Sequence, residues 1–159
     1  MSAEGLALRP ASSDDADLLL RWRNDAETRA QSLDSNVVPR EAHIRWLAQR
    51  LSDGEACRIW IAELEGQPVG QARVDRRSSA GGEISVSVDA AARGRGLGTM
   101  LIRLATERAR AEMGLRRLEA VVKPQNAASL AAFRRAAYAR GRTERRHDAD
   151  VVVLEWRDD

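Results

Sequence analysis

The sequence predicts one α/β (α+β) domain over residues 1–159, built on a mixed, mostly antiparallel sheet. Three observations support this fold class. The chain has 159 residues, the size of one ordinary domain. Strand-like segments are mixed with about four helix-like ones along the chain. One long amphipathic helix directly follows a strictly alternating strand, an order typical of α/β domains.

Turn residues and hydrophobic spacing predict five elements in the first half of the chain. In order, these are strand Leu6–Arg9, helix Asp14–Arg23, helix Arg40–Leu51, strand Arg58–Leu64 and strand Val69–Val74. Ser12 or Ser13 is a suitable N-cap for the first helix. Apolar side chains recur at helical spacing in the second helix. Turn residues Glu65–Pro68 join the two later strands into a hairpin. The polar stretch that runs up to Pro39 carries no predicted element.

Five further elements are predicted in the second half. They are strand Glu83–Val88, helix Gly96–Met113, strand Arg117–Val122, helix Asn126–Ala137 and strand Val151–Trp156. Ile84, Val86 and Val88 alternate with two serines, so the first of these strands has one apolar and one polar face. In the following helix, apolar residues recur at helical spacing from Leu97 onward, and Gly114 ends it.

The charge pattern argues against a dedicated nucleic-acid binder. The 26 basic residues nearly balance 24 acidic ones, the net charge is +2, and only 4% of residues are aromatic. Nucleic-acid binders show a stronger basic excess and more stacking aromatics, so no nucleic-acid partner is expected. Only Lys123 is a lysine, which leaves 25 arginines among the 26 basic residues. A GC-rich coding sequence explains this bias, and so does phosphate binding, because guanidinium matches phosphate oxygens.

The sequence also indicates the cellular setting. No apolar run approaches the ~18 residues that cross a bilayer. Met1–Pro10 lacks the basic segment followed by an apolar segment that is typical of a signal peptide. We therefore expect a cytoplasmic protein with no membrane partner. Cys57 stands alone, and with only His43 and His147 beside it a zinc site lacks ligands, so no metal is expected.

The segment after the alternating strand is the most informative for function. It places Gly94, Gly96 and Gly98 at the start of the long helix. Glycine permits a tight turn and the close approach of a ligand, and the free N–H groups of a helix start attract anions. The loop therefore predicts a phosphate or pyrophosphate site. It has neither the lysine of a Walker loop nor the glycine spacing of a dinucleotide-binding fingerprint.

This loop resembles the acetyl-CoA loop of the GNAT N-acetyltransferases, through the pattern Arg93-x-x-Gly96-x-Gly98. A second segment, Lys123-Pro-Gln-Asn126-Ala-Ala-Ser129 followed by Phe133 and Ala137-Tyr138, is similar to another block of that family. The likeness extends to the order of the surrounding elements and covers nearly the whole chain. It implies a GNAT-like sheet that splays at its central strand, and an enzyme that acetylates amines.

The resemblance implies acetyl-CoA as the co-substrate. Its pantetheine arm would pair with the backbone of Val86 to Val88, and its pyrophosphate would lie on the N–H groups of Gly94 to Thr99. Arg93 or Arg95 would add charge, Asn126 would bond the arm, and Phe133 would pack near the thiol. Asn126 also suits a plain helix N-cap. The cofactor-binding residues implied in this way are Val86, Ser87, Val88, Arg93, Gly94, Arg95, Gly96, Leu97, Gly98, Thr99, Asn126 and Phe133.

The acid and base of the family pattern are absent. Many members have a tyrosine, which protonates the leaving thiolate, about where Phe133 stands here, and some have a glutamate base where Val121 stands. The amine must still lose a proton before it attacks. Glu83 and His43 are the candidate catalytic residues. The alternatives are an exposed strand-end carboxylate for Glu83 and a helix-surface or core histidine for His43. Core packing is the better reading for Tyr138.

The acceptor is sought in the N-terminal helices. The residues assigned to it are Trp22, Asn24, Arg29, His43 and Trp46. This stretch is similar to GNAT proteins that acetylate nucleotide-linked deoxyamino sugars in pseudaminic-acid-type pathways. The two tryptophans suit stacking on a sugar or base, and Arg23, Arg29 or Arg45 suits a diphosphate. For each of these residues, core packing or a solvated surface position is an equal alternative.

Two other functions stay open. The Trp22-Arg23-Asn24 piece also appears in GNAT enzymes acting on ribosomal-protein N-termini, so a peptide N-terminal acetyltransferase is the runner-up. A non-catalytic acetyl-CoA-binding module is the third reading, because the tyrosine is missing. The sequence leaves the oligomeric state open between monomer and homodimer.

Overall fold

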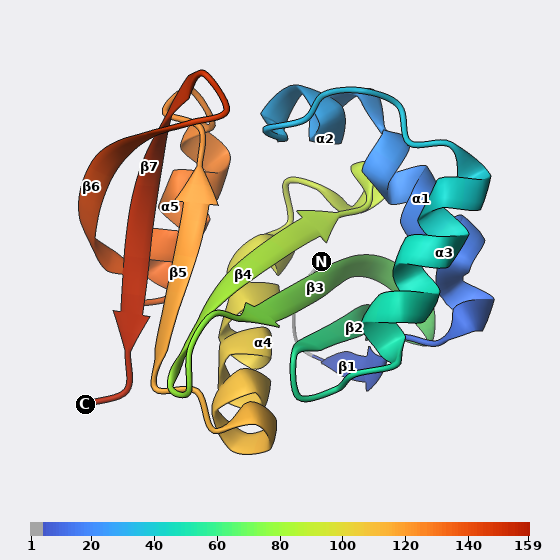
Figure 1. Ribbon diagram of the computed structural model, residues 1–159, viewed down its shortest axis with the longest axis horizontal. Coiled ribbons are helices and arrows are strands. Elements are labelled where there is room, and N and C mark those ends of the chain that lie inside the picture. Colours follow the sequence, from blue (N-terminus) through green and yellow to red (C-terminus); the bar gives the residue numbers. More distant parts are fainter. Residues whose placement is uncertain (1–4) are drawn as a thin grey trace.

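The computed structural model describes residues 5–159, and of Arg140 only the backbone. Seven strands form one sheet in the order β1-β2-β3-β4-β5-β7-β6 (Figure 1). Every neighbouring pair is antiparallel except β4 and β5. The strands are β1 Leu6–Pro10, β2 Cys57–Leu64, β3 Gln67–Arg76, β4 Gly81–Val88, β5 Arg117–Val122, β6 Ala139–Arg146 and β7 Ala149–Arg157. The predicted fold class, including the opening of the sheet at its centre, is confirmed.

Five α-helices and two short 3₁₀ helices accompany the sheet. They are η1 Ser13–Asp15, α1 Ala16–Asn24, α2 Ala26–Gln31, α3 Arg40–Leu51, η2 Ala90–Ala92, α4 Leu97–Met113 and α5 Ala127–Arg135. No helix among residues 5–159 is both long enough and apolar enough to cross a membrane. The first four residues of Met1–Pro10, the segment judged against a signal peptide, lie outside the described part of the chain.

One α-helix and one strand were not predicted from the sequence, nor was the short helix η2. The stretch before Pro39 contains α2, whose first turn is capped by the Asp25 side chain accepting from the Thr28 amide. The segment after Tyr138 forms β6, which pairs with β7 at the edge of the sheet. β6 is rich in arginine, and an edge strand tolerates such charge because one of its sides faces water.

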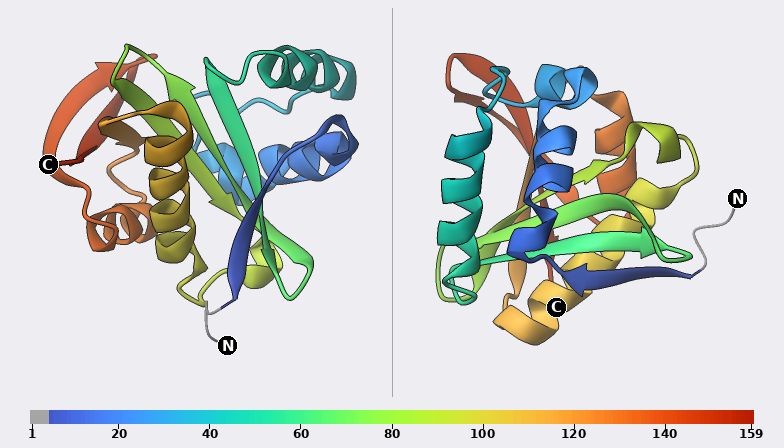
Figure 2. Two further views of the ribbon diagram at one scale, coloured as in Figure 1. Left: turned by 90° about the horizontal axis from the view of Figure 1, so that it is seen from below. Right: turned by 90° about the vertical axis from the view of Figure 1, so that its right-hand side faces the viewer.

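Helices cover both faces of the sheet. α4 and α5 lie on one face, while α1 and α3 lie on the other (Figure 2). The larger core lies between α4 and the sheet, around Trp60, Leu101 and Leu118. A second core joins α1 and α3 to β2, through Trp22, Leu47 and other side chains. The two cores fix the helices on opposite faces of the same strands.

The two central strands separate soon after they meet. β4 and β5 are paired only where Gly81–Glu83 of β4 lies beside Arg117–Glu119 of β5. Beyond these residues the two strands diverge (Figure 1). β3 stays paired with β4 as far as Val88, and β7 stays paired with β5 as far as Val122. The sheet therefore opens into a V, and α2 lies over the opening.

We predict that Gly70→Ala destabilises the fold. A Cβ at Gly70 would lie 2.6 Å from the Ser87 carbonyl oxygen and 3.3 Å from Leu101 Cδ2. Overpacking of this kind costs about 1–3 kcal/mol, and each kcal/mol lowers Tm by about 2–4 °C in a chain of this size. Thermal unfolding measures the change. Gly98→Ala is the control, because its Cβ would meet nothing closer than 3.9 Å. Equal Tm values for both variants and the parent would contradict the prediction.

Candidate active site

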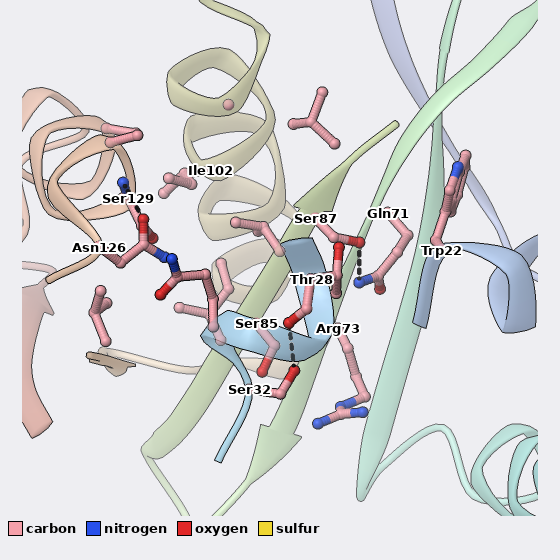
Figure 3. Close-up of a pocket in the computed structure, with 18 of the residues that line it drawn as sticks. Trp22, Thr28, Ser32, Gln71, Arg73, Ser85, Ser87, Ile102, Asn126 and Ser129 are labelled. Carbon is pink, nitrogen blue, oxygen red and sulfur yellow. Dashed lines mark hydrogen bonds between the residues drawn. The ribbon is translucent and has the colours of Figure 1, made fainter. Parts of the chain in front are cut away.

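A cavity of about 1270 Å³ occupies the opening between β4 and β5. Pockets for one small ligand usually measure about 300–1,000 Å³, so this one has room for more than a single small molecule. One side, here called the glycine-loop half, is lined by Val86, Val88, Gly94, Gly96, Leu97, Gly98, Thr99, Val121, Asn126 and Phe133. The other side, the three-helix half, is lined by Trp22, Arg23, Gln31, His43, Trp46, Gln71, Arg73, Ser85 and Ser87. Figure 3 labels Asn126 of the first half and Trp22, Gln71, Arg73, Ser85 and Ser87 of the second.

The glycine loop is shaped by its backbone. Gly94 and Gly96 have φ of +80° and +75°, which side chains other than glycine rarely adopt. Gly96 is the N-cap of α4 and has no side chain that could cap the helix. The first N–H groups of α4 therefore have no side-chain acceptor at the N-cap. Gly98 borders the space between Val88 and Ala132. The loop therefore presents backbone donors at the positive end of a 17-residue helix, an arrangement suited to an anion.

Arg93 holds the loop against the helices. Its Nη1 donates to Glu27 at 2.7 Å, its Nη2 to Asp25 at 2.9 Å, and its Nε to the Val88 carbonyl at 3.1 Å. The Arg93 guanidinium keeps the pKa of the Asp25 carboxyl below its usual range. Arg95 is exposed and is not part of the cavity wall. The glycine-loop backbone, more than either arginine, therefore faces the cavity.

Asn126 and Phe133 line the same half of the cavity. Asn126 caps α5 by accepting from the Ser129 amide at 3.2 Å, as the plain N-cap reading requires (Figure 3). Phe133 is buried and packs edge-on against Tyr138, with ring centroids 5.1 Å apart.

Tyr138 is part of the core and cannot supply an acid. The Tyr138 hydroxyl lies 2.7 Å from Thr106 Oγ1. The Thr106 hydroxyl already donates its hydrogen to the Ile102 carbonyl. Tyr138 is therefore the donor to Thr106, and its only hydroxyl hydrogen is engaged. Burial also raises the pKa of Tyr138. With Phe133 at the cavity wall, neither aromatic residue offers a proton to the cavity.

A polar floor, formed by Gln71, Arg73, Ser85 and Ser87, underlies the three-helix half. These residues share one face of β3 and β4, where Gln71 is directly opposite Ser87 and Arg73 is opposite Ser85. Gln71 Nε2 donates to Ser87 Oγ at 3.0 Å (Figure 3). The opposite face of β3 carries Ala72 and packs into the core under α4. The floor therefore offers several hydrogen-bonding groups without charge, and one guanidinium.

His43 and Trp46 stand beside this floor. Their rings stack with centroids 5.6 Å apart, and the Arg73 guanidinium lies 5.2 Å from the Trp46 ring centroid. His43 is only 5% exposed, and its Nε2 has no hydrogen-bond partner within residues 5–159. Burial lowers the pKa of His43, while the Ala16 carbonyl acts in the opposite direction. The cavity wall thus includes a buried, neutral imidazole whose Nε2 has no partner among the described residues.

A buried carboxylate fixes the arginines around Trp46. Asp75 is 3% exposed and accepts from Arg50 at 2.8 Å and from Arg73 at 3.0 Å. Both guanidiniums lie over the Trp46 ring, Arg50 at 5.7 Å. Burial beside Asp75 raises the pKa of the Cys57 thiol to about 12, so that thiol stays protonated. Asp75 therefore sets the position of Arg73 at the cavity wall.

Glu83 lines the cavity where the strands part, but its carboxylate is engaged. Arg77 and Arg146 donate to it at 3.3 and 3.2 Å. Val121, where some family members place a glutamate, lies across the opening on β5. Of the two candidate catalytic residues, His43 has the unpartnered proton-accepting atom.

The structure does not bring all the assigned acceptor residues to the cavity. Asn24 exchanges two hydrogen bonds with the backbone of Val38, and Arg29 donates to the carbonyls of Asn24 and Ser35. Both hold the loop between α2 and α3 and lie outside the cavity wall. Trp22 lines the cavity, but it is 4% exposed and its indole donates to Asp89 at 2.7 Å, which leaves little ring surface for stacking.

Sequence reasoning missed Gln31, Gln71, Arg73 and Asp75. A signal for part of this set was present, because polar residues at 71, 73 and 75 alternate with buried Ala72 and Val74. That alternation predicts a strand with a polar face. Gln31 had no such signal, since its position depends on α2.

The family described as an acetyltransferase (GNAT) domain matches residues 6–138. Among solved structures, the aminoglycoside acetyltransferase AAC(6')-Ib in complex with ribostamycin and coenzyme A superposes with a TM-score of 0.84 at 20% identity, over 97% of this chain and 94% of that one. A ribosomal-protein-alanine N-acetyltransferase from Brucella melitensis gives 0.81 at 29% identity, over 96% and 99%. Spermidine N-acetyltransferase from Vibrio cholerae, in complex with CoA and spermine, gives 0.86 at 13%, over 96% and 95%. No curated protein sequence matches closely enough to count as a relative.

The family match covers most of the chain and includes both the parted strands and the glycine loop. The chain belongs to the GNAT family, and it is an acetyltransferase.

Proposed function

We propose that the acceptor is a nucleotide-linked deoxyamino sugar, acetylated on its amine in the cytoplasm for surface-glycan synthesis. The observation that carries this proposal is the combination of Trp46, Arg73 and the polar floor in one half of the cavity. Such an acceptor presents a ring, hydroxyl groups and a diphosphate. The part of the Trp46 indole that stays exposed beside His43, Arg50 and Arg73 suits an apolar contact with the ring. Serine and glutamine groups suit the hydroxyls, and guanidinium suits the phosphate.

A peptide N-terminus is the second candidate acceptor. The 29% identity to the Brucella melitensis ribosomal-protein-alanine N-acetyltransferase, over nearly the full length of both chains, favours it. A peptide ammonium needs a carboxylate or carbonyls to bind it. The Glu83 carboxylate is already paired with two arginines, and the polar floor with Arg73 matches a peptide, which carries no phosphate, less well than a sugar nucleotide. This difference in the match to Arg73 weighs against the peptide candidate.

The glycine-loop half fits acetyl-CoA, which supplies the thioester that the amine attacks. Val86 to Val88 have a backbone edge without a partner strand on the β5 side, suited to the amides of an extended arm. The N–H groups of Gly94 to Thr99 are suited to the pyrophosphate. Asn126 and Phe133 complete this half as lining residues.

His43 is the proposed base. The amine arrives as an ammonium ion and must lose a proton before it attacks the thioester carbonyl. Nε2 of His43 accepts that proton, since burial keeps the imidazole neutral and no protein group occupies this nitrogen. Phe133 and Tyr138 supply no acid for the thiolate, so alignment of amine and thioester carries the rest of the rate.

Cofactor binding is tested with Gly96→Val. Acetyl-CoA at about 100 times its Kd stabilises the parent by about 2.7 kcal/mol. We expect this gain to vanish in Gly96→Val, because the branched side chain enters the space of the phosphate. Valine at this φ costs about 1–2 kcal/mol by itself, so the gain on adding acetyl-CoA is the quantity to compare. Gly114→Val is the matched control: Gly114 has φ +66° at the other end of α4, also with open space around it. An undiminished gain in Gly96→Val would refute the loop assignment.

The base is tested with His43→Gln against Glu83→Gln. We expect His43→Gln to lower kcat by about 10²–10⁴-fold, the usual contribution of a general base, with unchanged acetyl-CoA affinity. Because the pKa of His43 is lowered, the parent's rate should fall only as the pH drops below the ordinary histidine value of 6.5. Arg23 favours this shift and Asp17 opposes it. Thiol release is measured between about pH 5 and about pH 8. The fall in rate at low pH, the acid limb of the profile, should appear in the parent and in Glu83→Gln. It should be absent in His43→Gln. An unchanged limb in His43→Gln would remove His43 from the mechanism.

The acceptor class is tested by a panel of amines with acetyl-CoA in excess. We expect thiol release with an amino sugar linked to uridine diphosphate, and little with N-terminal peptides of ribosomal proteins, because the polar floor and Arg73 match the sugar and its phosphates. Mass spectrometry of the products identifies the acetylated amine. Efficient acetylation of the peptides with no turnover of the amino sugar nucleotide would overturn the sugar proposal and leave the family assignment intact.

A further inference from the structure

Three buried polar atoms around the three-helix half have no partner within the described chain. They are Arg23 Nη1, Gln31 Oε1 and His43 Nε2, and all three residues line the cavity. Arg23 is fixed from its other side, because its Nη2 donates to the Asp34 carbonyl at 2.7 Å. A buried donor or acceptor left unpaired costs about 1–3 kcal/mol. Their common cavity indicates that a ligand provides the missing partners.

The charge around the cavity indicates what kind of ligand this is. Its lining carboxylates are Glu27, Asp34 and Glu83, against the cationic Arg23, Arg73, Arg93, Lys123 and Arg135. Glu27 is paired with Arg93, and Glu83 with Arg77 and Arg146. Asp34 is exposed on the loop after α2. Among the described residues, the wall therefore lacks the buried, unpaired carboxylates that several ammonium groups would need. Arg73 and Arg93 are also paired with carboxylates, so the positive excess of the wall comes from Arg23, Lys123 and Arg135.

We propose that Arg23 and Gln31 select an acceptor that carries an oxyanion beside a single amine, and that this wall rejects polyamines and polyamino sugars. Arg23 Nη1 donates to the oxyanion, and Gln31 Oε1 accepts from a hydroxyl or N–H group of the same molecule. This assignment rests on the proposed amino-sugar acceptor. It adds the two residues, Arg23 and Gln31, that bind the acceptor and select it. It also distinguishes this chain from the structural neighbours that were solved in complex with ribostamycin and with spermine.

The test measures binding, so that it does not depend on turnover. Protein saturated with CoA, which occupies the glycine-loop half, is titrated with glucosamine 1-phosphate, glucosamine or spermidine. A hydrogen bond to a charged group contributes about 1.5–3 kcal/mol, so we expect glucosamine 1-phosphate to bind about 10- to 100-fold more tightly than glucosamine. Spermidine should bind most weakly. Arg23→Gln should reduce the preference for the phosphate, because only Arg73 then remains to bind it on this side of the cavity, and it should leave glucosamine binding near the parent value.

Gln31→Glu is the second variant, since it keeps the shape of the side chain and adds a carboxylate. It should weaken glucosamine 1-phosphate and improve spermidine. Thermal unfolding checks that both variants are folded, and Gln49→Glu, on the exposed side of α3, controls for the added charge. Spermidine binding as tight as glucosamine 1-phosphate in the parent, or an undiminished phosphate preference in Arg23→Gln, would overturn the proposal. Arg23-dependent binding without acetylation of any amino sugar nucleotide would instead refute the proposed function alone.

Discussion

The separation of β4 from β5 after Glu83 and Glu119 is the constraint on which the rest of the structure depends. If the two strands stayed paired to their ends, side chains and ladder hydrogen bonds would fill the place of the cavity. β3 and β7 hold the outer edges of β4 and β5, so the opening is rigid on both sides. Arg93 and Lys123 then connect the two sides to α2, through Glu27 and through the Ala30 carbonyl. The opening is thus bounded by a fixed sheet and covered by a helix attached through polar contacts.

The two faces of the central strands have different roles in the site. The apolar face of β3 and β4 packs under α4 and so fixes the helix start that the glycine loop opens. The polar face carries Arg73, which is positioned by the buried Asp75 and lies over Trp46. One alternating sequence pattern therefore builds both halves of the cavity. In the proposed reaction, donor and acceptor meet where the strands diverge, and their alignment there accelerates transfer without an acid at the thiol end.

The local features of the sequence were sufficient for most of the fold. The alternation of residues 84–88, the three glycines and the Asn126 cap depend on neighbours in sequence, and each prediction agrees with the structure. α2 and β6 were not predictable in this way. α2 is short and polar, and its ion pairs to Arg93 come from a residue far along the chain, while β6 depends on β7 for its pairing. Because α2 was not predictable, the different roles of Arg29 and Gln31 were not predictable either. Arg29 holds the loop between α2 and α3, whereas Gln31, two positions later, borders the cavity.

We expect the unpaired edge of β4 to receive the acetyl-CoA arm, and hydrogen exchange of individual amides tests this binding mode most directly. NMR-detected exchange is followed for Val86 to Val88 and for Gly94 to Thr99, without and with saturating CoA. The account predicts that at least one amide of Val86 to Val88, together with amides of the glycine loop, becomes protected on binding, because each gains an acceptor from the ligand. Amides of β6, at the far edge of the sheet, serve as the reference. Binding of CoA that leaves the exchange of Val86 to Val88 unchanged would contradict the account.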